Sequence, residues 1–142
     1  MAPRRPTPER RAGPDMIDHI SIAVRDLEAG GRFYEAALAA LGYSRLIARA
    51  TTIGFGKTYP DFWINLRPNM ATPDPNGGVH VCLRAPNTGA VDAFHTAALQ
   101  AGGQSDGAPG LRPEYNATYY AAFIRDPDGN RIEVVTFLDA RR

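Results

Sequence analysis

The chain has 142 residues, of which 44% are hydrophobic and 22% are charged, and its formal net charge at pH 7 is +1. This composition is typical of one globular domain with an apolar core, and the small net charge argues against a nucleic-acid-binding protein. No apolar run reaches the length of about 18 residues that a membrane-spanning helix needs, so no contact with a membrane is expected. The single cysteine, Cys82, allows no disulfide within the chain, which favours a cytoplasmic protein.

Residues 1–15 carry four arginines and four prolines and show no apolar periodicity. They are predicted to form a flexible basic tail outside the fold. The rest of the chain, residues 16–138, is predicted to be a single domain built from two units. Unit one covers residues 16–67, a linker covers 68–78, and unit two covers 79–138.

Unit one begins with an alternating segment in which Ile20, Ile22 and Val24 share one face of a strand. Asp26 is suited to cap the N-terminus of a helix, and Gly42 is suited to end that helix. Three strand-like segments follow, and the glycines in the second of them indicate a bulge or a close approach of the backbone. These three strands are placed at residues 43–48, 51–57 and 61–67.

Unit two repeats this plan after a linker rich in proline and glycine. Asn87 or Thr88 caps its predicted helix, which ends at a pair of glycines. Residues 104–116 are predicted to be mostly irregular, with one poor strand at most. Residues 126–130, Asp-Pro-Asp-Gly-Asn, are a strong signal for the turn of a hairpin. The strands of unit two are placed at residues 79–85, 119–125 and 131–137.

The two units are related by an internal repeat. A shift of 61 residues superposes His19 on His80, and the same shift matches Phe33 with Phe94. Each unit therefore presents one imidazole from the same place on its first strand. Such an arrangement can build a metal site on the pseudo-twofold axis of a duplicated fold.

Strand alternation separates an apolar face, which the helices should cover, from a polar face. The polar face carries His19, Ser21, Trp63, Asn65, Arg67, His80, Cys82, Arg131 and Glu133. Two histidines and a carboxylate in matched places fit a metal ion better than a wet surface, because imidazole and carboxylate groups are ligands of Fe(II), Mn(II), Ni(II) and Zn(II). The predicted substrate pocket is lined by Ser21, Trp63, Asn65, Cys82, Tyr115 and Arg131.

The sequence resembles the vicinal oxygen chelate superfamily, which includes glyoxalase I, extradiol dioxygenases, and the fosfomycin- and bleomycin-resistance proteins. The resemblance rests on the repeated units, on the segments around His19 and His80, and on Asp-Pro-Asp-Gly-Asn-Arg-Ile-Glu at residues 126–133. It covers residues 16–138 and implies an α+β fold of two tandem βαβββ units, which form a U-shaped mixed sheet around a central cavity. These motifs are specific for the superfamily and for no single reaction.

By position, the resemblance implies that His19, His80 and Glu133 hold one divalent metal ion, which would be Fe, Mn, Ni or Zn. Glyoxalase I enzymes add a glutamate on the last strand of the first unit, and Asn65 is the matching residue in this alignment. This departure leaves a His-His-Glu set like that of the extradiol dioxygenases. The sequence does not indicate which residues would correspond to the histidine and tyrosine that those enzymes place beside the ligands.

The resemblance favours a small metal-dependent enzyme of glyoxalase type, a lyase or isomerase that chelates neighbouring oxygens of a small-molecule substrate. The alternatives are an oxygenase like the extradiol dioxygenases, and a non-catalytic protein that binds a drug or metabolite. Exchange of units between subunits is common in the superfamily, so a homodimer is expected. The sequence assigns no catalytic residue, and it does not distinguish a site within one chain from one shared across the dimer.

Overall fold

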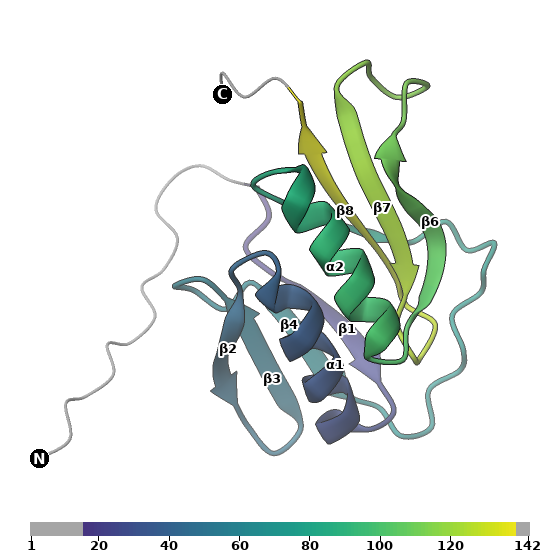
Figure 1. Ribbon diagram of the computed structural model, residues 1–142. Helices are drawn as coiled ribbons and strands as arrows, with labels where there is room; N and C mark the ends of the chain where they lie inside the picture. Colours follow the sequence, from purple (N-terminus) through teal and green to yellow (C-terminus); the bar gives the residue numbers. More distant parts are fainter. Residues whose placement is uncertain (1–15, 139–142) are drawn as a thin grey trace, which may run out of the picture.

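The computed structural model describes residues 16–138 and shows an α+β fold in which a strand, a helix and three strands occur twice (Figure 1). This confirms the predicted fold class. The elements are β1 (Ile20–Val24), α1 (Leu27–Ala39), β2 (Ser44–Ala48), β3 (Thr52–Gly56), β4 (Phe62–Leu66), β5 (Val81–Arg84), α2 (Thr88–Gln100), β6 (Gln104–Leu111), β7 (Tyr119–Arg125) and β8 (Arg131–Phe137). The tail predicted at residues 1–15 lies outside the described residues.

The strands form two mixed sheets of four strands each, and the two sheets have the same topology. The order is β1-β4-β3-β2 in the first sheet and β5-β8-β7-β6 in the second. In each sheet the first strand of the unit lies parallel to the last, and the other pairs are antiparallel. Within residues 16–138 no strand pairs with a strand of the other sheet, so β1 and β5 each form an open edge.

Local sequence signals set the ends of the helices as predicted. The side chain of Asp26 accepts a hydrogen bond from the amide of Ala29 at 2.9 Å, and the side chain of Asn87 accepts one from Ala90 at 2.8 Å. Both are N-caps, which satisfy amides that the helix itself leaves free. Gly42 follows α1 with a φ of 79°, a left-handed conformation that glycine adopts without strain.

The segment after α2 is more regular than the sequence suggests. Residues 104–111 form a strand of eight residues, β6, at the edge of the second sheet. Its pairing with β7 is irregular between Ser105 and Gly107 and again between Gly107 and Gly110. An edge strand needs backbone hydrogen bonds to one neighbour only, so a polar, glycine-rich segment can pair without the apolar alternation on which the prediction depended.

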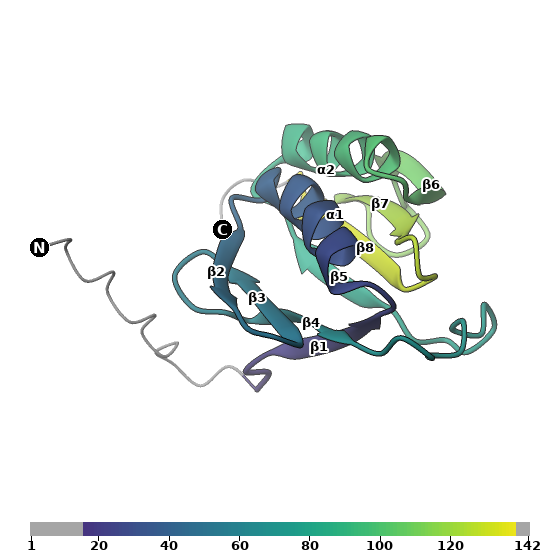
Figure 2. The same cartoon turned by 90° about the horizontal axis from the view of Figure 1, so that it is seen from below.

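The two helices lie side by side, with α1 over the first sheet and α2 over the second, and one apolar core runs through both units (Figure 2). Strand residues that face the helices are apolar, as alternation predicts: Ile64 of β4 and Val134 of β8 are fully buried. The opposite faces of the sheets carry the polar side chains of the predicted site together with aromatic ones, such as Trp63 and Phe123. Neither of the helices formed by residues 16–138 is long and apolar enough to cross a membrane.

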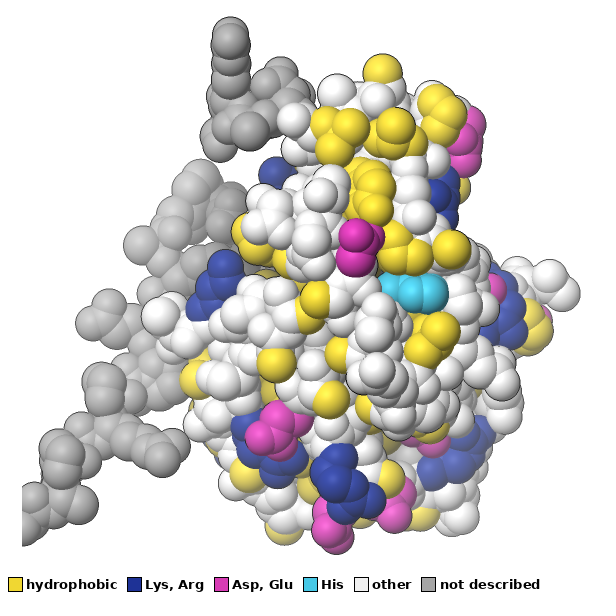
Figure 3. Space-filling model, in the orientation of Figure 1, with side chains coloured by type: hydrophobic (Ala, Val, Ile, Leu, Met, Phe, Trp, Pro, Cys, Tyr) yellow, Lys and Arg dark blue, Asp and Glu magenta, His cyan; other side chains and the backbone are white. Residues whose placement is uncertain are grey.

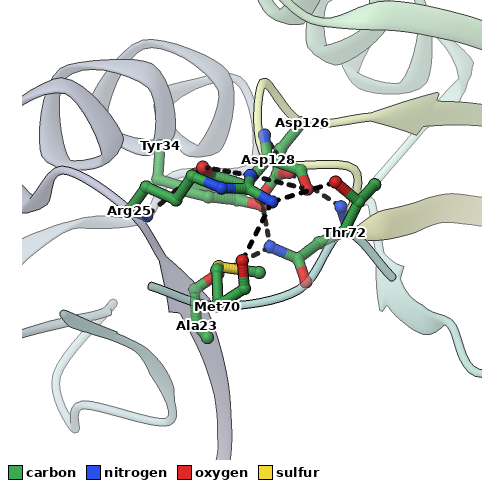
Figure 4. Close-up of polar contacts among 8 residues, drawn as sticks. Ala23, Arg25, Tyr34, Met70, Thr72, Asp126 and Asp128 are labelled. Carbon is green, nitrogen blue, oxygen red and sulfur yellow. Dashed lines mark hydrogen bonds and ion pairs between the residues drawn. The ribbon is translucent and has the colours of Figure 1, made fainter. Parts of the chain in front are cut away.

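A polar cluster joins the two units at one end of the core. We call this cluster the clamp, and its members are Arg25, Tyr34, Asp126, Asp128 and Asn130 (Figure 4). Arg25 Nη1 donates to Asp128 Oδ1 at 3.1 Å, and the Tyr34 hydroxyl donates to Asp126 Oδ2 at 2.5 Å. Asn130 Nδ2 donates both to Asp126 Oδ2 and to a backbone carbonyl of β1, each at 2.8 Å. The turn at residues 126–130 therefore holds the units together as well as reversing the chain.

Burial and hydrogen bonding act in opposite directions on the clamp carboxylate. Burial raises the pKa of Asp126, while its hydrogen bonds to Tyr34 and Asn130 lower it, and the net shift is upward. Burial and the Asp126 carboxylate also raise the pKa of Tyr34 well above its ordinary value. The phenol is thus a hydrogen-bond donor at neutral pH, which is the form that the carboxylate needs.

The clamp also fixes the linker between the units. Arg25 Nη2 donates to the carbonyl oxygen of Met70 at 3.3 Å and to the hydroxyl of Thr72 at 3.0 Å (Figure 4). One guanidinium thus contacts the end of β1, the linker and the turn before β8. These contacts set the position of one unit relative to the other at this end of the molecule.

Candidate functional site

The second sheet brings two of the predicted ligands together on its polar face. His80 Nε2 lies 3.0 Å from Glu133 Oε1, and Glu133 stands opposite Cys82 in the β5–β8 register. The Glu133 side chain is only 5% exposed, whereas that of His80 is 47% exposed. A carboxylate this deeply buried must be compensated by hydrogen bonds or a cation. The imidazole supplies one partner and remains open to solvent on its other side.

Tyr119 supplies the second partner of Glu133. Its hydroxyl donates a short hydrogen bond to Oε2, the carboxylate oxygen that His80 does not contact. Burial and this hydrogen bond raise the pKa of Tyr119, so the phenol keeps its proton at neutral pH. The rings of Tyr115 and Phe137 pack on that of Tyr119 with centroid distances of 5.2 and 5.5 Å. An aromatic wall therefore borders the carboxylate on this side.

Cys82 shares the face with His80 and Glu133, as strand alternation predicts. Burial of the sulfur and the Glu133 carboxylate raise the pKa of Cys82 to about 12, even though the residue as a whole is exposed. The thiol is therefore protonated at neutral pH and is a weak nucleophile in this environment. A bound cation beside Glu133 would oppose this effect, because it would favour the thiolate.

Arg131 and His80 line the same small cavity. Its Nε is 3.7 Å from Asp106 Oδ2, and Arg125 approaches Oδ1 of the same carboxylate at 3.4 Å. The cavity has a volume of about 120 Å³, and His80, Asp106 and Phe123 line it together with Arg131. The predicted pocket residue Arg131 is thus held next to the imidazole by an acidic residue of β6.

The first sheet places the remaining predicted residues away from this cluster. His19 is exposed, and its Nδ1 lies 2.7 Å from a carboxylate oxygen of Asp18. Asn65 donates to the Ser21 hydroxyl at 2.8 Å and to a backbone carbonyl of β1 at 2.9 Å. Trp63 donates its indole N–H to the carbonyl of Pro60 at 2.9 Å. The side chains of Ser21 and Asn65 therefore satisfy one another and hold β1 against β4.

The strand register changes one equivalence between the units. β1 pairs with β4 as β5 pairs with β8, and in this register Ile64 corresponds to Val134. It follows that Trp63 stands where Glu133 stands in the second unit. The sequence-based alignment of Asn65 with Glu133 is wrong because it assumed two inserted residues too few in unit two. An indole therefore occupies the position at which an additional acidic ligand was considered.

The three predicted metal ligands do not meet within one chain. Among residues 16–138 no group of three or more histidine, cysteine, aspartate or glutamate side chains is arranged to hold a metal ion. His80 and Glu133 converge on the second sheet, and His19 lies on the first, next to its open edge strand β1. A single subunit thus offers two ligands at one place and one at another.

Two residues of this face were not selected from the sequence for the roles they have. Tyr119 is not among the predicted pocket residues, and Asp106 lies in the segment predicted to be mostly irregular. The hairpin register places Phe123 opposite Glu133 and Tyr119 opposite Phe137. Counting outward from the turn at residues 126–130 would have put Tyr119 on the face of Glu133. No comparable signal existed for Asp106, since its strand lacks regular alternation.

Apolar side chains are also exposed near this face. Leu111 and Tyr115 are 48% and 63% exposed, and both lie in or next to the connection between β6 and β7. Figure 3 shows hydrophobic side chains gathered at that end of the molecule. Exposed apolar groups beside a polar cluster are typical of surfaces that bind a ligand or another subunit.

The profile of the Glyoxalase/Bleomycin resistance protein/Dioxygenase superfamily matches residues 16–134. The chain belongs to this superfamily. A glyoxalase/bleomycin resistance protein from Albidiferax ferrireducens is 31% identical, with 85% of this chain and 98% of that chain covered and a TM-score of 0.75. A search of curated proteins gave no match.

Two further solved structures share the superfamily fold at lower identity. A glyoxalase/bleomycin resistance protein/dioxygenase family enzyme from Burkholderia phytofirmans is 19% identical, covers 84% of this chain and 97% of its own, and has a TM-score of 0.65. A glyoxalase I variant from Zea mays is 23% identical over 82% of this chain and 44% of its own, also with a TM-score of 0.65. At this identity the likeness concerns the fold alone.

Proposed function

We propose that this superfamily member is a small metal-dependent enzyme of glyoxalase type, a lyase or isomerase that acts on a small molecule with neighbouring oxygen atoms. The observation that carries the proposal is the convergence of His80 and Glu133 on an open sheet face, with the buried carboxylate held by Tyr119. A structural ion pair would not need a half-exposed imidazole beside a cavity. The pair has the composition and the access that a metal site requires.

The donor set fits a divalent cation. His80 offers an imidazole nitrogen, Glu133 offers a carboxylate oxygen, and His19 of a second subunit would complete a two-histidine, one-carboxylate set for Fe, Mn, Ni or Zn. Such an ion supplies Lewis acidity, which stabilises negative charge on a substrate oxygen. Because Trp63 stands where a further acidic ligand would be, the protein would supply three ligands, and oxygens of the substrate would supply others.

The residues of the chain then have separate tasks. Tyr119 holds the Glu133 carboxylate in one orientation and shields it from water, together with the rings that pack on it. Arg131 places a positive charge beside His80. A guanidinium in this position favours the binding of an anionic or strongly polar group of a substrate.

A homodimer with exchanged units would bring the ligands together. Both open edges carry exposed apolar residues at the start of the strand: Met16 and Ile17 before β1 are 93% and 57% exposed, and Val79 before β5 is 82% exposed. Joining β1 of one subunit to the β5 edge of its partner would cover these side chains and continue one sheet into the other. His19 would then face the partner's His80 across a U-shaped sheet. The cytoplasmic location favoured by the single cysteine remains part of this proposal.

Two observations favour other activities of the same superfamily. The presence of Trp63 in place of a fourth ligand leaves the set that non-haem iron oxygenases use, which supports a reaction like that of the extradiol dioxygenases. The aromatic wall of Tyr115, Tyr119 and Phe137 would instead suit a protein that sequesters a drug or metabolite without converting it. A test of metal binding distinguishes the sequestering protein from the two metal-dependent enzymes.

Elemental analysis of the purified protein tests the proposal. Chelator-treated protein, reconstituted separately with Fe(II), Mn(II), Ni(II) and Zn(II), is expected to retain about one ion per subunit. His80→Ala should lose that ion and still unfold cooperatively, because a half-exposed side chain is removed. His95→Ala is the matched control, since His95 bonds to Ser105 at the surface. If the wild type retains none of the four ions, the enzyme proposal is wrong and the sequestering function is favoured.

A further inference from the structure

The clamp occurs once, although the duplicated fold provides two places for it. By the repeat, Arg25 of the clamp corresponds to Pro86 at the end of β5. The strand registers of the two hairpins place Lys57 where Asp126 lies. The position equivalent to the clamp thus lacks both the guanidinium and the carboxylate that join the two units in the clamp.

A cavity occupies this second place. Its volume is about 780 Å³, and Lys57 and Pro86 are among the residues that line it. It lies between the hairpin of β3 and β4 in unit one and the ends of β5 and β8 in unit two. Volumes of this size are typical of sites for small molecules. A ligand here would join the two units at the end of the molecule where the clamp is missing.

The cavity carries two positively charged side chains that form no ion pair among the described residues. Lys57 and Arg84 line it, and within residues 16–138 neither forms an ion pair with a carboxylate. The Arg84 guanidinium lies 5.0 Å from the centre of the Phe137 ring, which also lines the cavity. Asp61 is the single carboxylate among the described lining residues. Among the described lining residues the two cations outnumber the one carboxylate, which favours an anionic ligand.

Two features of unit two add hydrogen-bond donors. Helix α2, 13 residues long, begins at the cavity with Thr88, and its N-cap Asn87 uses its side chain on Ala90 alone, so the first amides of the helix remain available. Thr136 also lines the cavity and is only 6% exposed, yet its hydroxyl has no hydrogen-bond partner among the described residues. This hydroxyl is therefore available to a ligand in the cavity as a donor or an acceptor.

We propose that this cavity is a second binding site, for a small molecule that carries a phosphate or carboxylate group on an aromatic or apolar body. Lys57, Arg84, Thr136 and the first amides of α2 bind the anionic group. Phe137 and Pro86 contact the apolar body. Neither His80 nor Glu133 lines the cavity, so the site contains none of the proposed metal ligands, although Phe137 also packs on Tyr119 beside the proposed metal centre.

Titration with phenyl phosphate tests the site in the full chain. The protein is kept in a chelator, so that no metal ion can bind the phosphate, and amide chemical shifts are followed by nuclear magnetic resonance. Saturable shifts are expected at Thr88, Gly89 and Thr136. Inorganic phosphate and benzoate should bind more weakly than phenyl phosphate, and phenol should bind least, because each lacks part of the proposed recognition. Affinity should fall with ionic strength.

Substitutions assign the binding to the cavity. Lys57→Ala and Arg84→Ala should each lower the affinity for phenyl phosphate about tenfold, because each removes a charge-assisted contact. Thr136→Val keeps the volume of the side chain and should weaken binding without affecting the fold. Arg32→Ala, which removes an exposed arginine on α1, is the matched control and should have no effect. Absence of saturable binding, or binding that Lys57→Ala and Arg84→Ala leave unchanged, would overturn the proposal.

Discussion

Glu133 is the residue on which the chemistry of the molecule depends most. A carboxylate with a 5% exposed side chain is stable in its ionised form only if both oxygens have partners. His80 takes one oxygen and Tyr119 the other. If a metal ion takes the place beside His80, the bond from Tyr119 still fixes the orientation of the carboxylate. Tyr119 is therefore a positioning residue that acts through Glu133.

Replacement of Tyr119 by phenylalanine tests this role. Tyr119→Phe removes only the hydroxyl and should weaken metal binding by about 10- to 100-fold, the range found when a partner of a metal ligand is lost. Competition with a chromophoric chelator measures the change. Tyr120→Phe is a matched control, because the neighbouring hydroxyl bonds to Asp92 on the helix side of the sheet. Equal metal affinities of the two variants and the wild type would assign Tyr119 a purely structural role.

Among the elements, the hairpin of β7 and β8 contributes to both the fold and the site. Its turn carries the clamp carboxylates, and its strands carry Tyr119 and Glu133. Loss of the Tyr34 hydroxyl should therefore weaken the fold without touching the site. Tyr34→Phe is expected to lower the free energy of unfolding by about 1–3 kcal/mol, because a buried carboxylate loses a donor. Urea denaturation measures this loss, and metal content should not change.

The effect of Tyr34→Phe should depend on pH. Burial raises the pKa of Asp126 above the ordinary value of 3.8, so the native state binds this proton more tightly than the unfolded state does. The contribution of Asp126 to stability is therefore fully present below the ordinary pKa and is lost as the pH rises through the raised one. The Tyr34 hydroxyl limits this loss by stabilising the ionised carboxylate.

The difference between wild type and Tyr34→Phe should accordingly be larger at neutral pH than in acid. Comparing the two proteins at each pH cancels the titration of groups that they share. Unfolding free energies at pH 7 and near the ordinary pKa of aspartate supply the two points. A difference that is the same at both pH values would show that Asp126 does not change its protonation state between them in the native protein, which would contradict this prediction.

The sequence was most informative where local rules decide the structure. Strand alternation and helix caps at Asp26 and Asn87 predicted the order of elements in unit one and, apart from β6, in unit two. The glycines of β3 indicated a bulge or a close approach of the backbone. A Cβ at Gly56 would lie 1.9 Å from the carbonyl oxygen of Tyr59, so this prediction is confirmed. The irregular edge strand β6 lacked such a signal, because its backbone pairing does not depend on side-chain pattern.

The site was predictable only in part. Alternation grouped His80, Cys82 and Glu133 on one face, since these residues lie on adjacent strands of one sheet. The distance of His19 from that group follows from how the two units dock, which no short segment of sequence encodes. The equivalence of Trp63 with Glu133 likewise required the pairing of β1 with β4, because the lengths of the intervening loops differ between the units.

For the whole molecule, a metal site shared between two subunits predicts how mixed dimers behave. His19→Ala and His80→Ala should each abolish metal binding, but a dimer of one subunit of each kind would keep one intact site and lose both ligands at the other. Refolding an equal mixture of the two variants should thus restore about a quarter of the wild-type metal content, since half of the dimers are mixed. Elemental analysis before and after mixing provides the measurement.

Two controls complete this experiment. The double variant His19→Ala/His80→Ala is refolded with wild type as the first control. The metal content of this mixture should not exceed that of the wild-type subunits in it. Sedimentation should show a dimer in every case. No recovery of metal in the mixture of single variants would mean that each chain builds its site alone.

The separation of the two sheets also has a consequence for how the chain folds. Every strand pairing within residues 16–138 lies inside one unit, and the first pairs that close the sheets, Ile20 with Phe62 and Val81 with Ile132, do not cross the linker. Because the entropic cost of closing a loop rises with its length, each half can complete its sheet without waiting for the other. During synthesis on the ribosome, the first half can thus be assembled before the second has emerged. Docking of α1 on α2 requires both halves and therefore follows the assembly of the first.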